Sequence, residues 1–165
     1  MRLVEGYADV DDVDAVLDDL NGVASTHGVT VQAFDARYVV GRGHLERAVE
    51  LADRAIARGE NVARERGVEI LLYAAGRRQI DDALEMGIRE GRTPVVVVVS
   101  GIDESAERDA AAAVGDLLDP GSTLDAIDAE RVRAFFDVTE AELGAVDGDL
   151  TDLIAERVAL LDVEK

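Results

Sequence analysis

The sequence has no cysteine, one lysine and two histidines among its 165 residues. Without cysteine, disulfide bonds, thiolate zinc sites and a cysteine nucleophile are excluded. Apolar runs are short: the five valines from Val95 to Val99, for instance, fall far below the ~20 residues of a membrane-spanning helix. The first residues reach charge too early for a signal peptide. We therefore expect a cytoplasmic protein without membrane contact.

Common catalytic motifs are missing as well. Because the only lysine is Lys165, there is no glycine-rich loop ending in Lys-Ser or Lys-Thr, and no serine lies in a nucleophile-elbow pattern. His27 and His44 have no companion at three- or four-residue spacing, so neither predicts a metal pair. Neighbouring acidic residues point away from each other on a helix and do not form a catalytic pair. These absences favour a protein without enzymatic activity, metal or cofactor.

The charge of the chain is strongly negative. Acidic residues number 36 against 17 basic ones, a net charge of -19, yet 48% of the residues are hydrophobic, which indicates a folded protein rather than a disordered acidic chain. Aspartate outnumbers glutamate by 21 to 15, and 16 of the 17 basic residues are arginine. This balance is similar to that of proteins from salt-loving archaea, in which molar salt shortens the Debye length to about 3 Å and screens the self-repulsion.

Hydrophobic patterning predicts a single domain over residues 1–165. Its fold class is α+β, or mixed α/β, with a small mixed sheet and a helical C-terminus. Strands are expected at Arg2–Ala8, within Val29–Val40, at Ile70–Ala74 and at Val95–Val99, the last in the centre of the sheet. Helices are expected at Val10–Leu20, His44–Arg58, Ile80–Ile88, Asp103–Leu118, Ala126–Phe136 and Leu150–Val163, with a turn at residues 119–122.

The stretch Val68–Ile88 is the segment around which we expect the chain to be organised. It reads as a buried strand, Ile70–Ala74, then a break at Gly76 and a helix. Arg77 and Arg78 lie at the turn, where free backbone N–H groups and guanidinium groups together favour phosphate. Two aspartates in the first turn of the helix provide an alternative, because they would pair with the arginines and leave a charged, solvated turn.

Positive charge is concentrated in the middle of the chain. From Arg37 to Arg92 there are 11 arginines against 10 acidic residues, whereas the remainder carries 6 basic against 26 acidic residues. This distribution indicates a surface that meets a polyanion. A solvated helix face is the simpler interpretation of the arginines within residues 44–58.

The final helix has an apolar stripe of roughly 160°, which is wider than a surface helix needs. Arg157 lies inside this stripe. The pattern is typical either of a core helix with a snorkelling arginine or of a helix that is half core and half partner surface. The stripe consists of Leu150, Leu153, Ile154, Arg157, Val158, Leu160 and Leu161.

Several segments together resemble a known family. Residues 69–88, EILLYAAGRRQIDDALEMGI, follow Asn61-Val62-Ala63-Arg64, with HLERAVELADRAI upstream and IAERVALLDV at the end. This sequence resembles the small regulatory subunit of the KEOPS complex, an archaeal relative of the PRPK-binding protein family. The likeness covers nearly the whole chain, and the segment around AAGRRQI is its most specific part.

The resemblance implies a non-catalytic subunit without a cofactor. KEOPS makes threonylcarbamoyladenosine (t6A) in tRNA, and this family binds its kinase-like ATPase subunit and, in archaea, recruits tRNA through the 3′ CCA end. No DNA-specific binding is expected. The family's basic surface commonly includes lysines, which are absent here or replaced by arginine. The implied tRNA-binding residues are Asn61, Arg64, Arg77, Arg78 and Gln79. The implied partner-binding residues are Leu153, Ile154, Arg157, Leu160 and Leu161.

Two other hypotheses compete with this one. A small enzyme or sensor of a phosphorylated metabolite would use the turn from Gly76 to Arg78 and predicts a closed pocket there. A merely structural, salt-adapted domain predicts that the arginines between Arg37 and Arg92 spread over all faces of the molecule.

Overall fold

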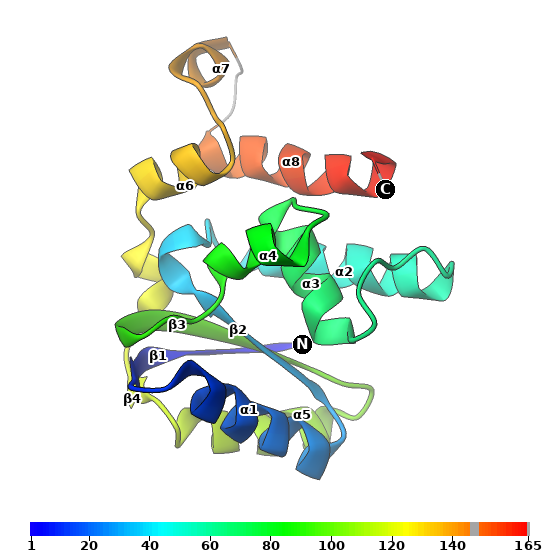
Figure 1. Ribbon diagram of the computed structural model, residues 1–165, viewed down its shortest axis with the longest axis vertical. Helices are drawn as coiled ribbons and strands as arrows, with labels where there is room; N and C mark the ends of the chain where they lie inside the picture. Colours follow the sequence, from blue (N-terminus) through cyan, green and yellow to red (C-terminus); the bar gives the residue numbers. More distant parts are fainter. Residues whose placement is uncertain (146–148, 165) are drawn as a thin grey trace.

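A four-stranded antiparallel sheet separates two groups of helices in the computed structural model, which describes residues 1–145 and 149–164 (Figure 1). The strands are β1 (Arg2–Val10), β2 (Thr30–Asp35), β3 (Gly91–Ser100) and β4 (Asp119–Pro120). Their order is β2-β3-β1-β4. The predicted α+β class is confirmed, but the predicted mixed sheet is wrong because every pairing is antiparallel.

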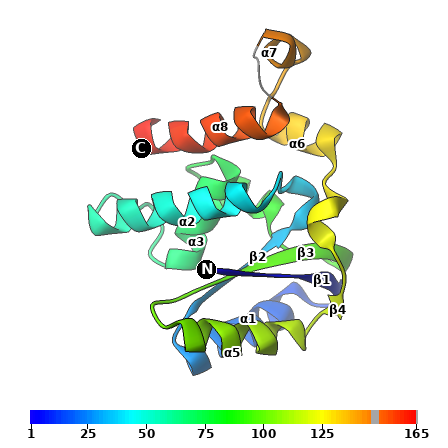
Figure 2. The ribbon, with the colours of Figure 1, turned by 180° about the vertical axis from the view of Figure 1, so that it is seen from behind.

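Helices cover both faces of this sheet. The α-helices are α1 (Val13–His27), α2 (Arg42–Ala57), α3 (Arg66–Ala75), α4 (Ile80–Ala83), α5 (Glu104–Gly115), α6 (Ala129–Phe135), α7 (Glu140–Ala145) and α8 (Leu150–Glu164). Short 3-10 helices are η1 (Ala36–Tyr38), η2 (Leu84–Met86) and η3 (Thr123–Ala126). Helices α1 and α5 lie on one face, whereas α2 and α3 lie on the other and carry α8 on their outer side (Figures 1 and 2).

The valine run in β3 connects the two halves of the core. Side chains alternate between the faces of a strand, so Val95, Val97 and Val99 pack toward α1 and α5, while Val96 and Val98 pack toward α2 and α3. All five valines are buried. The prediction of a central strand at this position is confirmed.

The predicted strand at Ile70–Ala74 is wrong, because these residues lie within helix α3. Each of them is at most 2% exposed, since α3 is enclosed by the sheet, α2 and α8. A fully buried segment is apolar on every side, so a short run shows no period that distinguishes a helix from a strand.

Several predicted boundaries also differ. Helix α1 continues past Asn21-Gly22 to His27, because Val23 and Ala24 pack against the core beside α5 and outweigh the local turn signal. The predicted helix at Ile80–Ile88 is only α4 followed by η2. The predicted turn at residues 119–122 contains the two-residue strand β4, which pairs with β1. No helix in the described part of the chain is long and apolar enough to span a membrane.

Candidate functional site

The C-terminus of α3 forms the first wall of the candidate site. Gly76 caps the helix with φ +61°, a left-handed conformation that glycine adopts without strain. The N–H groups of Gly76 and Arg77 donate to the carbonyls of Tyr73 and Leu72, both at 3.1 Å, which closes the helix end. Arg77 and Arg78 therefore lie between two helices, and not after a strand as the sequence predicts.

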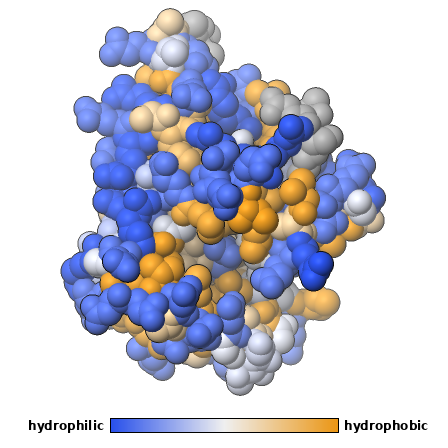
Figure 3. Space-filling model, viewed as in Figure 1, coloured by the Kyte–Doolittle hydropathy of each residue, from blue (hydrophilic) through white to orange (hydrophobic). Residues whose placement is uncertain are grey.

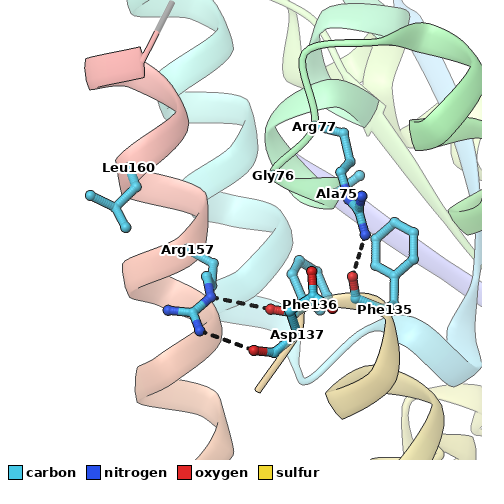
Figure 4. A pocket seen from close by; sticks show the side chains of 8 residues that line it. All are labelled: Ala75, Gly76, Arg77, Phe135, Phe136, Asp137, Arg157 and Leu160. Carbon is cyan, nitrogen blue, oxygen red and sulfur yellow. Dashed lines mark hydrogen bonds between the residues drawn. The ribbon is translucent and has the colours of Figure 1, made fainter. Parts of the chain in front are cut away.

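A cleft of about 210 Å³ opens where the ends of α3 and α6 meet α8 (Figure 4). The chain turns sharply at the end of α6, where Asp137 has φ +53°, the only positive φ among the described residues other than glycine. The cleft is lined by Ala75, Gly76, Arg77, Phe135, Phe136, Asp137, Arg157 and Leu160.

Arg77 occupies the α3 side of this cleft. Its guanidinium donates to the carbonyl of Phe135 and lies 4.5 Å from the centre of the Phe135 ring. The free carbonyls at the end of a helix need donors, and arginine supplies them here. One of the predicted tRNA-binding residues therefore has a structural contact within the chain.

Arg157 occupies the opposite side and holds the next two carbonyls. Its Nε donates to the Phe136 carbonyl at 3.2 Å, and its terminal nitrogen donates to the Asp137 carbonyl at 3.3 Å (Figure 4). The same nitrogen pairs with Glu142 at 2.6 Å, which lowers the pKa of that carboxyl. Arg157 thus ties α8 to the end of α6 and to α7, which explains an arginine inside an apolar stripe.

A buried histidine supports the cleft from beneath. His44 Nε2 lies 2.7 Å from the Ala74 carbonyl, and Nδ1 accepts from the Val40 N–H at 3.3 Å. The side chain is buried, and burial lowers the pKa of His44 to about 4. The imidazole is therefore neutral at pH 7 and donates from Nε2 to the end of α3.

The remaining predicted tRNA-binding residues form two separate groups. Arg78 and Gln79 are exposed beside the cleft, whereas Asn61 and Arg64 belong to the loop before α3. A helix as long as α3 extends for about 15 Å, which separates the two groups. In the loop, the Asn61 amide donates to the Ala63 carbonyl at 2.8 Å, and exposed Arg64 has no ion pair with any described residue.

The arginines between Arg37 and Arg92 do not form one positive surface. Seven of the eleven pair with carboxylates, on α2, beside β2 and at the edge of the sheet, so their charge is largely neutralised locally. The seven are Arg37, Arg42, Arg47, Arg54, Arg66, Arg89 and Arg92. This result agrees with the structural, salt-adapted hypothesis for most of these residues.

The predicted partner-binding residues also divide into two groups. Leu153, Ile154 and Leu161 are buried against α2 and α3, so their side chains are not available to a partner in this structure. Arg157 and Leu160 remain at the surface, with Leu160 41% exposed. The centre of the broad apolar stripe is core, and its edge reaches the surface.

The sequence does not reveal the exposed flank of α8 that borders α2. Thr151 and Ala155 are exposed there, one turn apart, and they border a second cavity of about 280 Å³ between α2 and α8. Small side chains on a helix give little hydrophobic signal, so only the packing of α8 reveals that this flank is exposed.

The cleft beside Gly76 is open to the surface, in contrast to the closed pocket that the metabolite hypothesis predicts. Among the residues that the structure describes, no group of histidine and acidic side chains is arranged to hold a metal ion.

A family model described as "Kinase binding protein CGI-121" matches residues 7–162. No curated protein matches the chain significantly.

Proposed function

The chain belongs to the CGI-121 family of kinase-binding proteins, a non-catalytic subunit of the KEOPS complex, and we propose that it joins the kinase-like ATPase subunit to tRNA. The kinase-like subunit would bind the exposed flank of α8 that borders α2, at Thr151 and Ala155. The tRNA would bind through its 3′ CCA end at the two ends of α3, and the complex would use this arrangement to make t6A.

The proposal that the kinase-like subunit binds α8 is supported by the exposed residues of this helix. Leu153, Ile154 and Leu161 fix the helix against α2 and α3, so its exposed flank is held in one position before a partner binds. Thr151 and Ala155 have small side chains that allow close approach. Leu160, which lines the cleft beside Gly76, supplies an exposed apolar side chain on the same helix. A pre-ordered helix with a small-residue surface and an apolar flank suits docking against another folded domain.

The RNA surface is supported by Arg64 and Arg78, both exposed. At the base spacing of a DNA strand, about 3.4 Å per nucleotide, roughly four nucleotides would follow the length of α3 from one arginine to the other. Guanidinium groups at phosphate contacts would then position the tail, while the amides of Asn61 and Gln79 would reach base edges.

Binding in molar salt needs contacts besides charge, since counterion release weakens phosphate contacts steeply. Ile80 and Leu84 are exposed apolar residues close to Arg78 in the chain. Figure 3 shows apolar surface gathered over the region of α3 and α4, surrounded by hydrophilic side chains. This apolar surface offers salt-resistant contact to the bases of the tail.

The proposed kinase-binding surface is tested by the Ala155→Arg variant, which adds bulk at an exposed position on the flank of α8. Its affinity for the purified kinase-like subunit should fall at least tenfold, because hot spots at an interface cost about 2 kcal/mol or more. The matched control is Ala112→Arg, which makes the same change on exposed α5. Equal affinities for the two variants would contradict the proposed surface.

The RNA surface is tested by reversing charge at Arg64 and Arg78 together and measuring affinity for tRNA with and without its CCA tail. The double variant should lose most of the tail-dependent binding. Arg108→Glu serves as control, because Arg108 is exposed on α5 across the sheet. Retention of tail-dependent binding by the double variant would refute this part of the proposal.

A further inference from the structure

We propose that an apolar slot between α1 and the segment after α5 binds a basic segment of a partner protein, which inserts one leucine-sized side chain. The slot lies on the face of the sheet opposite α2, α3 and α8, so it is separate from both surfaces of the proposed function (Figure 1). Its volume of about 160 Å³ is close to that of a dry cavity of about 150 Å³ that holds benzene. One large apolar side chain therefore fits.

Three strands form the floor of the slot. Ala33 of β2, Val97 of β3 and Ala8 of β1 all line it, and each is at most 5% exposed. Ala33 and Val97 lie opposite each other in the strand register. Because an alanine side chain ends at Cβ, it leaves space above the strand that a larger residue would occupy.

Helix α1 covers this floor only in part. Of its 15 residues only Leu20 is buried, whereas seven residues of α2 are buried on the other side of the sheet. Asp19 and Leu117 also line the slot and are exposed, so it opens to the surface and is not an internal packing void. Figure 3 shows apolar surface beside the position of α1, with hydrophilic side chains around it.

The rim of the slot is acidic. Asp9 and Asp19 line its opening, and residues 9–19 and 116–119 together contain eight aspartates and no basic residue. Among the described residues, only Arg92 forms ion pairs with any of these aspartates. Such a rim repels RNA phosphates, and it repels the same face of a second copy of this chain. It attracts arginine or lysine side chains that flank an inserted apolar one.

Salt separates the two contributions to binding. At molar salt the Debye length is about 3 Å, so only charges in direct contact attract each other, whereas the burial of apolar surface persists. The inserted side chain should therefore supply the affinity at high salt, and its basic neighbours should supply selectivity that decreases as the salt concentration increases.

The probe is a labelled peptide with one leucine between two pairs of arginines, and its binding is followed by fluorescence anisotropy at a lower and a higher salt concentration. A peptide with alanine in place of leucine should bind at least about tenfold more weakly at both, because it buries less apolar surface. A peptide with glutamates in place of the arginines should also bind more weakly, and this difference should shrink at the higher salt concentration.

Two variants test the floor and the rim. Ala33→Ile fills the slot with a residue favoured in strands, so affinity for the leucine peptide should fall to that for the alanine peptide. Asp19→Arg reverses an exposed rim charge and should weaken binding by about threefold or more at the lower salt concentration. Asp109→Arg makes the same change at an exposed position of α5 outside the slot and should bind as the wild type does.

Valine methyl resonances of the wild type locate the peptide without any variant. Val95 and Val97 should shift when the leucine peptide is added, whereas Val96 and Val98, on the other face of β3, should not. Equal affinity for the leucine and alanine peptides, wild-type binding by Ala33→Ile, or shifts confined to Val96 and Val98 would overturn the proposal. Self-association of the chain that Ala33→Ile abolishes would assign the slot to a second copy and overturn it as well.

Discussion

His44 should make the stability of the protein depend on pH in a defined window. The side chain is 5% exposed and lies between the Val40 N–H and the Ala74 carbonyl, where only a neutral imidazole satisfies both contacts. Burial lowers its pKa from 6.5 to about 4. Because the unfolded chain then binds more protons than the folded one between these two values, stability falls as the pH decreases through this window.

The size of the effect follows from the shift. A change from 6.5 to about 4 amounts to roughly 3 kcal/mol when it is fully expressed. At about pH 4.5 the protein should have lost roughly 2.5 kcal/mol of unfolding free energy through this group relative to pH 7.5. Such a loss is a large part of the total stability of a domain, which is typically about 5–15 kcal/mol.

The assay is urea denaturation followed by circular dichroism at both pH values and constant high salt, for the wild type and His44→Gln. Glutamine does not titrate, yet its amide still reaches a carbonyl partner. Carboxylates whose pKa is lowered by folding, such as those of Glu107 and Glu142, also lose stabilisation in acid, but they do so in both proteins and cancel. An equal acid-induced loss in wild type and variant would refute the reasoning.

Two further predictions concern the supports of the proposed surfaces. Tyr73→Phe removes the 2.8 Å hydrogen bond from α3 to Asp162 near the end of α8, so the free energy of unfolding should fall by about 1 kcal/mol in thermal denaturation; an unchanged midpoint would contradict this role. Glu69→Gln weakens the buried carboxylate that accepts the Val62 N–H with both oxygens at 3.0 Å. Amide exchange at Val62 should become faster, while exchange in β3 stays near its wild-type rate; equal acceleration throughout the chain would indicate global destabilisation instead.

The sequence predicts a helix or strand well where one side of the element is buried and apolar and the other is exposed and polar. In helix α2, buried apolar residues recur every three or four positions, with charged residues between them. The helix is found within two residues of the predicted bounds. The β3 valines were identified by their branching and length. By contrast, Ile70–Ala74 is buried on every side. Its residues are therefore all apolar, and their order does not distinguish the 3.6-residue period of a helix from the two-residue period of a strand.

The candidate site was only partly predictable for a related reason. Position in the sequence identified Arg77 and Arg157 as unusual, but the Phe135 and Phe136 carbonyls that they bind become neighbours only in the folded chain. Asp137 gave no signal, because one aspartate among 21 is unremarkable until its backbone angle is known. Composition likewise showed where the arginines concentrate, and could not show that most of them pair locally.

One measurement tests directly whether this chain joins the kinase-like subunit to tRNA. Labelled tRNA is applied to the immobilised kinase-like subunit with the wild-type chain, with Ala155→Arg, or with the Arg64→Glu, Arg78→Glu double variant. The wild type should increase tRNA retention well above that of the kinase-like subunit alone, and either variant should abolish the increase. Retention that does not need the chain, or that both variants support as well as the wild type, would contradict it.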